Sequence, residues 1–328
     1  MLFKTALLAF AAQGAFAEIV AYWGNGGYTE ADGNLADWCK DKEHIDILVL
    51  AFLTNFGHGQ YPNGNLGYCQ INPDGTSSGC EQLEQDIGTC QQLGKKVFIS
   101  MPGSEGDFGL NSKGDAEGVA YSLWNSYGAP NAVQDKSKRP LGNVRIDGWD
   151  IDIESNPYDE DGKGYLGAML NKLRSYFEAD TAHKYYIGGA PQCYLNHDQG
   201  KNMDLNMGNS INQAKYDYLW IQFYNNECAA THAYDGSNQF NLNEWPGVIA
   251  NGASKNAKLY VGIPGNKAEA PEYVPTAHLA DVYNAAKGVK GFAGFMVYEV
   301  GDTKSVVVKN GCDYFGQIYS VLTTVHLC

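Results

Sequence analysis

The regular alternation of two kinds of segment is the feature that most constrains how this chain folds. Short apolar runs rich in β-branched residues alternate with stretches whose apolar residues recur at spacings of three and four, as on an α-helix. The short runs lie at residues 19–23, 45–52, 96–101, 144–153, 185–190, 218–223, 259–263 and 292–297. The helical stretches include residues 80–93, 114–127, 164–179 and 277–287. Eight strands that alternate with helices predict an α/β fold, a closed (β/α)8 barrel of the TIM type.

An open, doubly wound sheet is the alternative arrangement for the same alternation. Such a sheet normally binds a nucleotide through a GxGxxG turn after its first strand. Residues 24–27 read Gly-Asn-Gly-Gly and do not fit that turn. The chain has no Ser/Thr/Pro-rich linker, and residues 264–291, between the last two strands, have room only for a loop and one helix. We therefore predict a single barrel domain at residues 18–328, with no inserted α+β domain.

The first 17 residues have the pattern of a secretory signal peptide. Lys4 precedes an apolar run that ends in Ala15-Phe16-Ala17, the small-x-small pattern of a signal peptidase site. We predict that residues 1–17 are removed and that the protein is secreted to the extracellular space. The run is too short to span a bilayer, and no later run approaches the ~18 apolar residues that a span requires, so we expect no membrane association.

The charge of the chain bears on its partners. The formal net charge is −14, and removal of Lys4 with the signal peptide makes it one unit more negative. Nucleic-acid binding draws its affinity from clustered Lys and Arg, so no nucleic-acid partner is expected. A neutral or cationic ligand fits this charge better.

The cysteines predict disulfides, because their number is even and secretion exposes them to an oxidising compartment. No Cys-x-x-Cys pair occurs and the seven histidines are scattered, which argues against a structural zinc site. Eight cysteines allow 105 pairings, and their spacing does not choose among them. They are Cys39, Cys69, Cys80, Cys90, Cys193, Cys228, Cys312 and Cys328.

The most informative motif is the sequence DGWDIDIE at residues 147–154, at the end of the fourth predicted strand. Side chains alternate across a strand, so Asp150, Asp152 and Glu154 share one face and the apolar residues between them share the other. In a barrel the apolar face packs under the helices, which turns the three carboxylates inward. Like charges at such short spacing keep at least one of the carboxyl groups protonated. Glu154 falls at the C-terminal end of the strand, where barrel enzymes carry their catalytic groups.

A metal site and a solvated acidic loop are the alternatives for this motif. No His and no further acidic cluster stands beside it in the sequence, and the apolar residues between the acids argue for a strand. We therefore expect an array for acid–base chemistry, with no metal and no cofactor.

The motif resembles the signature of family 18 glycoside hydrolases, and the chain after residue 17 resembles the plant and fungal class III chitinases, the hevamine-like group. Four further segments carry the resemblance, in order along the predicted strands. They read AYWG at residues 21–24, AFL at 51–53, APQC at 190–193 and IQFYNN at 221–226.

The resemblance implies a role for each matching residue. Glu154 would protonate the glycosidic oxygen and later activate water, and Asp152 would orient the acetamido group of the substrate. Asp150 would share charge and a proton with Asp152, and Tyr224 would hydrogen-bond the acetamido oxygen. The acetamido oxygen of the substrate then acts as the nucleophile, which makes the family an exception to the two-carboxylate scheme.

The same resemblance implies a set of sugar-binding residues and two departures from the family pattern. Pro102 replaces a glycine at the predicted turn after the third strand, and Tyr298 replaces the Trp that forms the floor of the cleavage site. The substrate-binding residues implied are Tyr22, Phe52, Gln222, Asn225 and Tyr298.

The resemblance also implies a disulfide pattern. It pairs Cys39 with Cys90, Cys69 with Cys80 and Cys193 with Cys228, and the two remaining cysteines, Cys312 and Cys328, would form an added pair near the C-terminus.

The function implied is that of a secreted, monomeric, endo-acting chitinase that hydrolyses β-1,4 links between N-acetylglucosamine units. Its partner would be chitin or an N-acetylglucosamine-containing oligosaccharide. Two alternatives stay open. One is an endo-β-N-acetylglucosaminidase that acts on N-glycan cores, and the other is a catalytically silent chitin-binding lectin or inhibitor.

Overall fold

The structure is a computed structural model of the 328-residue chain. It describes residues 17–25, 32–40, 44–132, 136–154, 165–196, 202–203, 206–306 and 310–328. The predicted signal peptide therefore lies outside the described residues except for Ala17.

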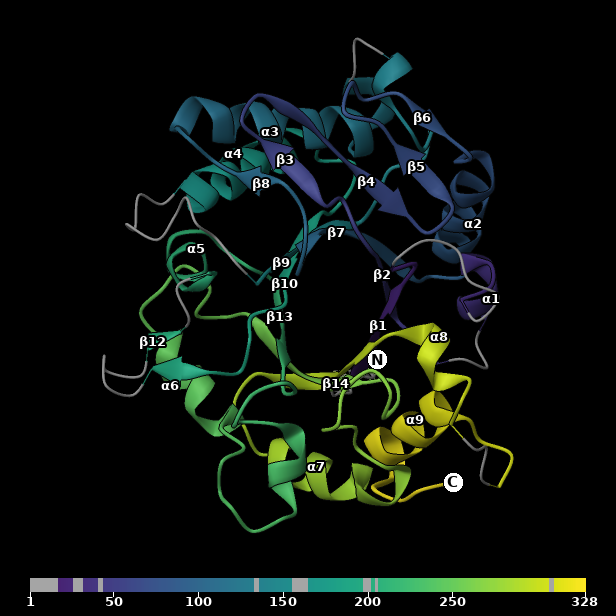
Figure 1. The fold of residues 1–328 in the computed structure, drawn as a ribbon, viewed down its shortest axis with the longest axis vertical. Helices are drawn as coiled ribbons and strands as arrows, with labels where there is room; N and C mark the ends of the chain where they lie inside the picture. Colours follow the sequence, from purple (N-terminus) through teal and green to yellow (C-terminus); the bar gives the residue numbers. More distant parts are fainter. Residues whose placement is uncertain are drawn as a thin grey trace, which may run out of the picture.

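An eight-stranded parallel sheet forms the centre of the molecule, and each of the eight runs predicted as strands contributes to it (Figure 1). The order around the sheet is β10-β9-β7-β2-β1-β15-β14-β13. Hydrogen bonds from the amide of Asp217 to the carbonyl of Ile187, at 2.8 Å, and from Gln222 to Pro191, at 2.9 Å, bring the two end strands together. The predicted barrel is thus confirmed. Its strands are β1 (Glu18–Trp23), β2 (Ile47–Leu50), β7 (Lys96–Gly103), β9 (Gly148–Ile153), β10 (Tyr186–Gly189), β13 (Tyr218–Gln222), β14 (Lys258–Pro264) and β15 (Phe292–Tyr298).

Helices surround the barrel (Figure 1). The four long helical stretches predicted from the sequence are helical, with α2, α3, α4 and α7 at nearly the expected bounds. Ser112 caps the N-terminus of α3, because its hydroxyl accepts the amide of Asp115. Among the described residues, no helix is long and apolar enough to cross a bilayer. The helices are α1 (Leu35–Trp38), α2 (Glu81–Gln92), α3 (Lys113–Tyr127), α4 (Tyr165–Ala179), α5 (Gly208–Gln213), α6 (Trp245–Val248), α7 (Leu279–Ala286), α8 (Val300–Thr303) and α9 (Tyr314–Thr324).

The core has two parts, because alternate residues of each strand face opposite ways. The larger part lies between the strands and the helices, and the smaller one fills the inside of the barrel. The inner part is rich in aromatic rings, among them Tyr22, Phe98, Tyr218, Trp220 and Tyr260.

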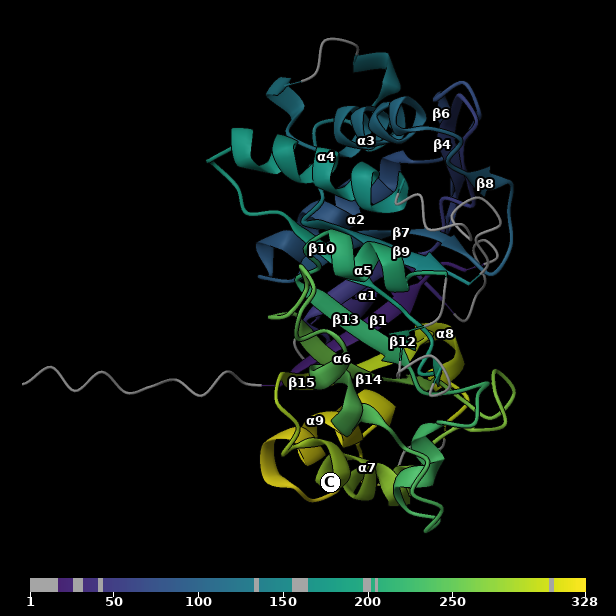
Figure 2. The same cartoon turned by 90° about the vertical axis from the view of Figure 1, so that its left-hand side faces the viewer.

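A second, five-stranded sheet is the feature that the sequence analysis did not predict. It is built mainly from the connection between β2 and α2, and its order is β6-β5-β4-β3-β8. Figure 2 shows β4, β6 and β8 at the end of the molecule toward which β7 and β9 run. The amide of Phe52 donates to the carbonyl of Asn65 at 2.7 Å, which ties this sheet to the end of β2. Its strands are β3 (Asn55–Gly57), β4 (Gln60–Leu66), β5 (Cys69–Ile71), β6 (Ser77–Ser78) and β8 (Phe108–Gly109), and a further hairpin pairs β11 (Leu195–Asn196) with β12 (Asn202–Met203).

Only a loop, a short 3-10 turn at Thr276–His278 and α7 separate β14 from β15, so this connection, which the structure describes in full, holds no inserted domain. All eight cysteines are paired, and the three pairs implied by the family resemblance are confirmed together with the added pair. They are Cys39–Cys90, Cys69–Cys80, Cys193–Cys228 and Cys312–Cys328.

A carboxylate at the start of β1 joins three strands where they begin. Glu18 lies 2.6 Å from the ammonium nitrogen of Lys258, 3.3 Å from that of Lys96 and 2.5 Å from the hydroxyl of Tyr260. Burial by itself would raise the pKa of Glu18, but these hydrogen bonds and charges outweigh burial and hold that pKa below its ordinary value. These contacts join the start of β1 to β7 and β14.

Candidate active site

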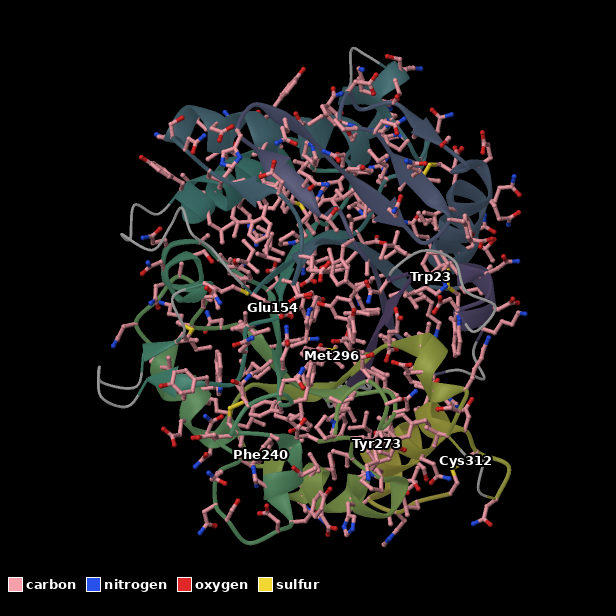
Figure 3. All side chains as sticks on the ribbon, viewed as in Figure 1. Trp23, Glu154, Phe240, Tyr273, Met296 and Cys312 are labelled. Carbon is pink, nitrogen blue, oxygen red and sulfur yellow. A yellow bond between two sulfur atoms is a disulfide. The ribbon has the colours of Figure 1, made fainter. Side chains whose placement is uncertain are left out.

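The three inward carboxylates predicted from the DGWDIDIE motif lie along β9, which pairs with β7 on one side and β10 on the other. Asp150 is fully buried, Asp152 is 4% exposed, and Glu154 follows the last residue of the strand and is half-buried. We call these three residues the carboxylate ladder. Figure 3 shows Glu154 toward the centre of the barrel, while Phe240 and Cys312 lie in its outer layers.

Asp150, the deepest carboxylate, accepts hydrogen bonds from three different strands. The hydroxyls of Tyr22 and Ser100 each donate to its Oδ2 at 2.6 Å, and the indole nitrogen of Trp220 donates to its Oδ1 at 2.9 Å. These donors come from β1, β7 and β13 and occupy both oxygens. Asp150 is therefore a buried carboxyl group whose hydrogen-bond donors stabilise its ionised form.

Gln222 links the two upper carboxylates. Its side-chain nitrogen lies 2.8 Å from Oδ1 of Asp152, 3.2 Å from Oε1 of Glu154 and 3.1 Å from the carbonyl oxygen of Ala190. Because Oδ1 of Asp152 accepts from this amide, a proton on Asp152 belongs on the other oxygen.

The environment separates the pKa values within the ladder. Burial raises the pKa of Asp150, although its hydrogen bonds from Ser100, Tyr22 and Trp220 hold that pKa to about 6. Burial, and then the charges of Glu154 and Asp150, raise the pKa of Asp152 well above its ordinary value. Burial and the neighbouring negative charges therefore favour the protonated form of Asp152.

A cleft of about 540 Å³ opens above the ladder. Asp152, Glu154 and Tyr224 line it, so the predicted acid, its neighbour and the tyrosine meet in one cavity. Burial, and then the charge of Asp152, raise the pKa of Tyr224, which keeps its hydroxyl protonated as a hydrogen-bond donor. The cleft thus brings together a half-buried carboxyl group, a buried carboxyl group and a phenol.

An aromatic wall bounds the same cleft. The ring of Tyr298 lies 5.4 Å from that of Tyr22 and 6.5 Å from that of Phe52, with the second pair stacked. Phe52, Tyr298 and Asn225, three of the substrate-binding residues implied by the family resemblance, line the cleft. A flat apolar wall beside polar groups is typical of sites that stack a sugar ring.

The comparisons with known proteins agree with this geometry. A family model, Glycosyl hydrolases family 18, matches residues 18–298. The chain belongs to this family. It is therefore a glycoside hydrolase.

Relatives and solved structures of this family extend the comparison. Endochitinase 2 of Metarhizium robertsii is 36% identical over 327 residues, a match that covers 95% of this chain and 74% of that protein. The ICChI chitinase of Ipomoea carnea is 29% identical with a TM-score of 0.71, over 87% of this chain and 96% of that one. A xylanase and alpha-amylase inhibitor protein of Scadoxus multiflorus is 25% identical with a TM-score of 0.69, over 88% of this chain and 94% of that one. The family 18 barrel is thus shared by enzymes and by a protein named as an inhibitor.

Two predicted binding residues lie below the cleft of this family 18 barrel. Tyr22 is 1% exposed and Gln222 is 4% exposed, and neither lines the cavity. Tyr22 donates to Asp150 and Gln222 to Asp152 and Glu154, so both act on the ladder from within the barrel.

The expected position of Pro102 was wrong. The sequence analysis placed it in a turn after the third strand, but β7 continues through Pro102 to Gly103. Pro102 pairs in register with Asp152, and both it and Gly103 line the cleft. The strand tolerates the proline because it lies near the C-terminal end of β7, where the ladder with β9 ends one residue later.

Sequence reasoning missed several residues of the site. Ser100 and Trp220 were not assigned to it, although strand alternation places Trp220 on the same face as Gln222 and would have indicated its inward position. Within the described ranges, no three His, Cys, Asp or Glu side chains are arranged to hold a metal ion. The lining residues not predicted include Asn25, Thr54, Asn65, Ser104, Glu105 and Glu269.

Proposed function

We propose that this family 18 enzyme is a secreted, endo-acting chitinase that hydrolyses β-1,4 links between N-acetylglucosamine units with retention of configuration. The observation that carries the proposal is that Glu154, Asp152 and Tyr224 line one cleft. Beneath it, the side-chain nitrogen of Gln222 contacts both carboxyl groups. The names of these relatives, an endochitinase and a chitinase, support chitin as the substrate.

Glu154 is the proton donor of the proposed mechanism. It stands at the end of β9, in the cleft, and protonates the glycosidic oxygen as the bond to the leaving sugar breaks. The acetamido oxygen of the substrate attacks the anomeric carbon, which forms an oxazolinium-type intermediate. Glu154, now ionised, then takes a proton from the water that opens this intermediate, and the original anomeric configuration is restored.

Asp152 and Tyr224 position the acetamido group. The phenol of Tyr224 donates to the acetamido oxygen and sets its direction of attack. Asp152 lies between the charge on Asp150 and Glu154, where an oxygen of its carboxyl group accepts the acetamido N–H. Positive charge develops on the acetamido group during the attack, and the negative ladder stabilises it.

Endo-action follows from the short connection between β14 and β15. Because residues 265–291 hold only a loop, a 3-10 turn and α7, this connection builds no tall wall beside the cleft. A chain bound along the cleft therefore extends at both ends. On a soluble chitin derivative, viscosity should drop before much reducing sugar appears, and release of disaccharide alone from the start would contradict endo-action.

An endo-β-N-acetylglucosaminidase is the second candidate, and Tyr298 is the observation that favours it. A tyrosine wall offers a smaller stacking surface than tryptophan and adds a hydroxyl, so it suits a different sugar at the cleavage site. A silent lectin or inhibitor is a third possibility, but such a protein has no need of an acid, a buried carboxyl group and a phenol in one cleft.

The deciding experiment incubates the protein separately with chito-oligosaccharides and with a high-mannose glycopeptide. Cleavage of the oligosaccharides supports the chitinase, and cleavage of the glycopeptide alone supports the second candidate. Binding without cleavage of either supports the lectin. The Glu154→Gln variant, run in parallel, controls for contaminating activity. Secretion is tested by the N-terminal sequence of the exported protein, which should begin at Glu18.

A further inference from the structure

The indole of Trp220 reaches across the inside of the barrel. Trp220 lies on β13 and Asp150 on β9, with β10 between these two strands. On β10 the register partner of Asp150 is Gly188, and a Cβ at that position would lie 2.3 Å from two ring carbons of Trp220. The glycine therefore makes the space through which the indole reaches the deepest carboxylate.

Trp220 differs chemically from the other donors to Asp150. Its Nε1 lies 2.9 Å from Oδ1 of Asp150 and 3.0 Å from the hydroxyl oxygen of Tyr22. The hydroxyls of Tyr22 and Ser100 either donate or accept, whereas an indole N–H only donates. Trp220 and Asp150 are both fully buried, so solvent does not replace this donor. A proton on Oδ1 would point at the indole hydrogen, and this oxygen is therefore kept as an acceptor.

We propose that Trp220 is a positioning residue that holds the negative charge of the carboxylate ladder on Asp150 and so keeps the shared proton on Asp152. The inference rests on the proposed function, in which Asp152 is the carboxyl group that contacts the acetamido group of the substrate. Trp220 does not line the cleft, so it acts through Asp150 and not on the substrate.

The groups that face Asp150 define what else contributes to its titration. Asp152 lies above it on its own strand and Glu154 just after that strand ends. Tyr22 faces it from β1, and burial and then the charge of Asp150 raise the pKa of Tyr216, just before β13. From β7 it meets Ser100, which does not titrate, and from β10 it meets a glycine without a side chain. The tyrosines have raised pKa values and stay neutral, so the acidic neighbours and the three donors set the charge of Asp150.

The first test compares the same substitution at two buried tryptophans, one on β13 and one on β9. Trp220→Phe removes the indole N–H from Asp150 while keeping an aromatic ring in the barrel. Trp149→Phe is the matched control, because Trp149 is also fully buried and its Nε1 has no hydrogen-bond partner within the described residues. Both variants lose packing, but only the first loses a donor to the ladder.

The expected readout is the pH profile of kcat/KM on a chito-oligosaccharide. In Trp220→Phe the carboxylate of Asp150 loses one of its three donors, so the acidic limb should move to higher pH by about one to two units. Trp149→Phe should keep the acidic limb of the wild type. Equal profiles in the two variants would overturn the proposal.

A second readout needs no activity. The indole N–H resonance of Trp220, assigned by its loss in Trp220→Phe, should shift with pH as Asp150 titrates and should stop shifting in Asp150→Asn. The resonance of Trp149 should not follow this titration. A Trp220 signal that is flat from acidic to neutral pH would refute the inference even in a protein that cleaves chitin. If the protein does not cleave chitin, the proposed function fails, but the titration of the Trp220 resonance still tests the inference.

A third variant covers the case in which Trp220→Phe fails to fold. Gly188→Ala places a methyl group against the ring of Trp220 and displaces the indole from Asp150. It should move the acidic limb in the same direction as Trp220→Phe. A folded Gly188→Ala protein with the wild-type limb and an unchanged indole titration would contradict the proposal.

Discussion

The side-chain nitrogen of Gln222, buried beneath the cleft, lies 2.8 Å from Oδ1 of Asp152, which lines the cleft. Gln222 comes from β13 and Asp152 from β9, and the same nitrogen reaches Ala190 just after β10, the strand between them. The Gln222 amide therefore links β13 to β9 and to the residue after β10 at the height of Asp152. This contact also leaves the other carboxyl oxygen of Asp152 free of the Gln222 amide.

Gln222→Met keeps the length of the side chain but removes the amide. Asp152 and Glu154 lose their shared donor, so we expect kcat to fall by about 10- to 100-fold, in the range of one or two lost hydrogen bonds to acidic groups, while KM changes little. Steady-state kinetics on a chito-oligosaccharide measure the effect. Gln92→Met, at the exposed end of α2, is the matched control and should behave as the wild type. A larger change in KM than in kcat would instead make Gln222 a substrate-binding residue.

Glu154→Gln preserves the size of the side chain and removes its titrating proton. If Glu154 is the general acid, turnover should fall by about 10²- to 10⁴-fold while oligosaccharide binding survives. Turnover is measured by product release, and binding by calorimetry with the intact oligosaccharide. Substantial residual turnover in the purified variant would remove Glu154 from this role.

Much of the barrel was predictable because its signals are local. Strand alternation along β9 places Asp150 and Asp152 inside from the sequence alone, and the eight apolar runs mark all the strands of the barrel. The five-stranded sheet around β4 was not predictable in the same way. Its strands are short and carry Gly and Asn in place of apolar runs, so their pairing depends on contacts with Phe52 and the rest of the barrel.

The candidate site was predictable where a motif marks it and not where distant strands meet. Tyr22 belongs to a matching segment, but its contact with Asp150 spans 128 residues, and that of Trp220 spans 70. Local sequence pattern gives the face on which each side chain lies, but not which side chains touch across a barrel. For the same reason it did not show that Tyr22 lies under the cleft instead of in its wall.

Glu18→Gln tests the contacts of Glu18 at the start of β1. Loss of the charge that Lys258 and Lys96 neutralise should cost about 1 to 2 kcal/mol of stability near pH 7, on the scale of hydrogen bonds to charged groups. The pKa of Glu18 is lower in the folded protein, so its contribution is present above its unfolded pKa and is lost as the pH falls through its folded pKa. Urea unfolding at several pH values should show the two proteins converging in acid. A constant difference down to the most acidic pH would contradict this account.

Removal of the Cys312–Cys328 pair tests the disulfide near the C-terminus. The pair closes a loop with a sequence separation of 16 residues, so replacing both cysteines by Ser should cost about 3 kcal/mol through the added entropy of the unfolded chain. The same double replacement at Cys39 and Cys90, with a separation of 51, should cost more. Thermal unfolding under non-reducing conditions ranks the two variants. Activity of the folded fraction should survive removal of the first pair, since neither of its residues lines the cleft.

The wall of the cleft gives the final prediction, because the family resemblance implies that Tyr298 stands where other members carry a Trp. Its ring lines the cleft and stacks with Phe52, and burial, followed by the charge of Glu299, raises its pKa, so the hydroxyl stays protonated. If the sugar stacks on this ring, Tyr298→Ala should lower kcat/KM by about tenfold or more, because aromatic contacts contribute ~1 kcal/mol beyond their buried area. Tyr298→Trp should raise affinity for chito-oligosaccharides a few-fold by widening the stacking surface.

The alternative role for Tyr298 is packing against Tyr22, whose ring lies 5.4 Å away. In that case Tyr298→Ala would lower the melting temperature and leave kcat/KM of the folded fraction unchanged. Tyr121→Ala, at an exposed tyrosine on α3, controls for the general effect of losing an aromatic ring and should change neither quantity. A loss of kcat/KM in Tyr298→Ala without a matching loss in Tyr121→Ala assigns the stacking role, because only a ring in contact with the sugar stabilises its distorted transition state.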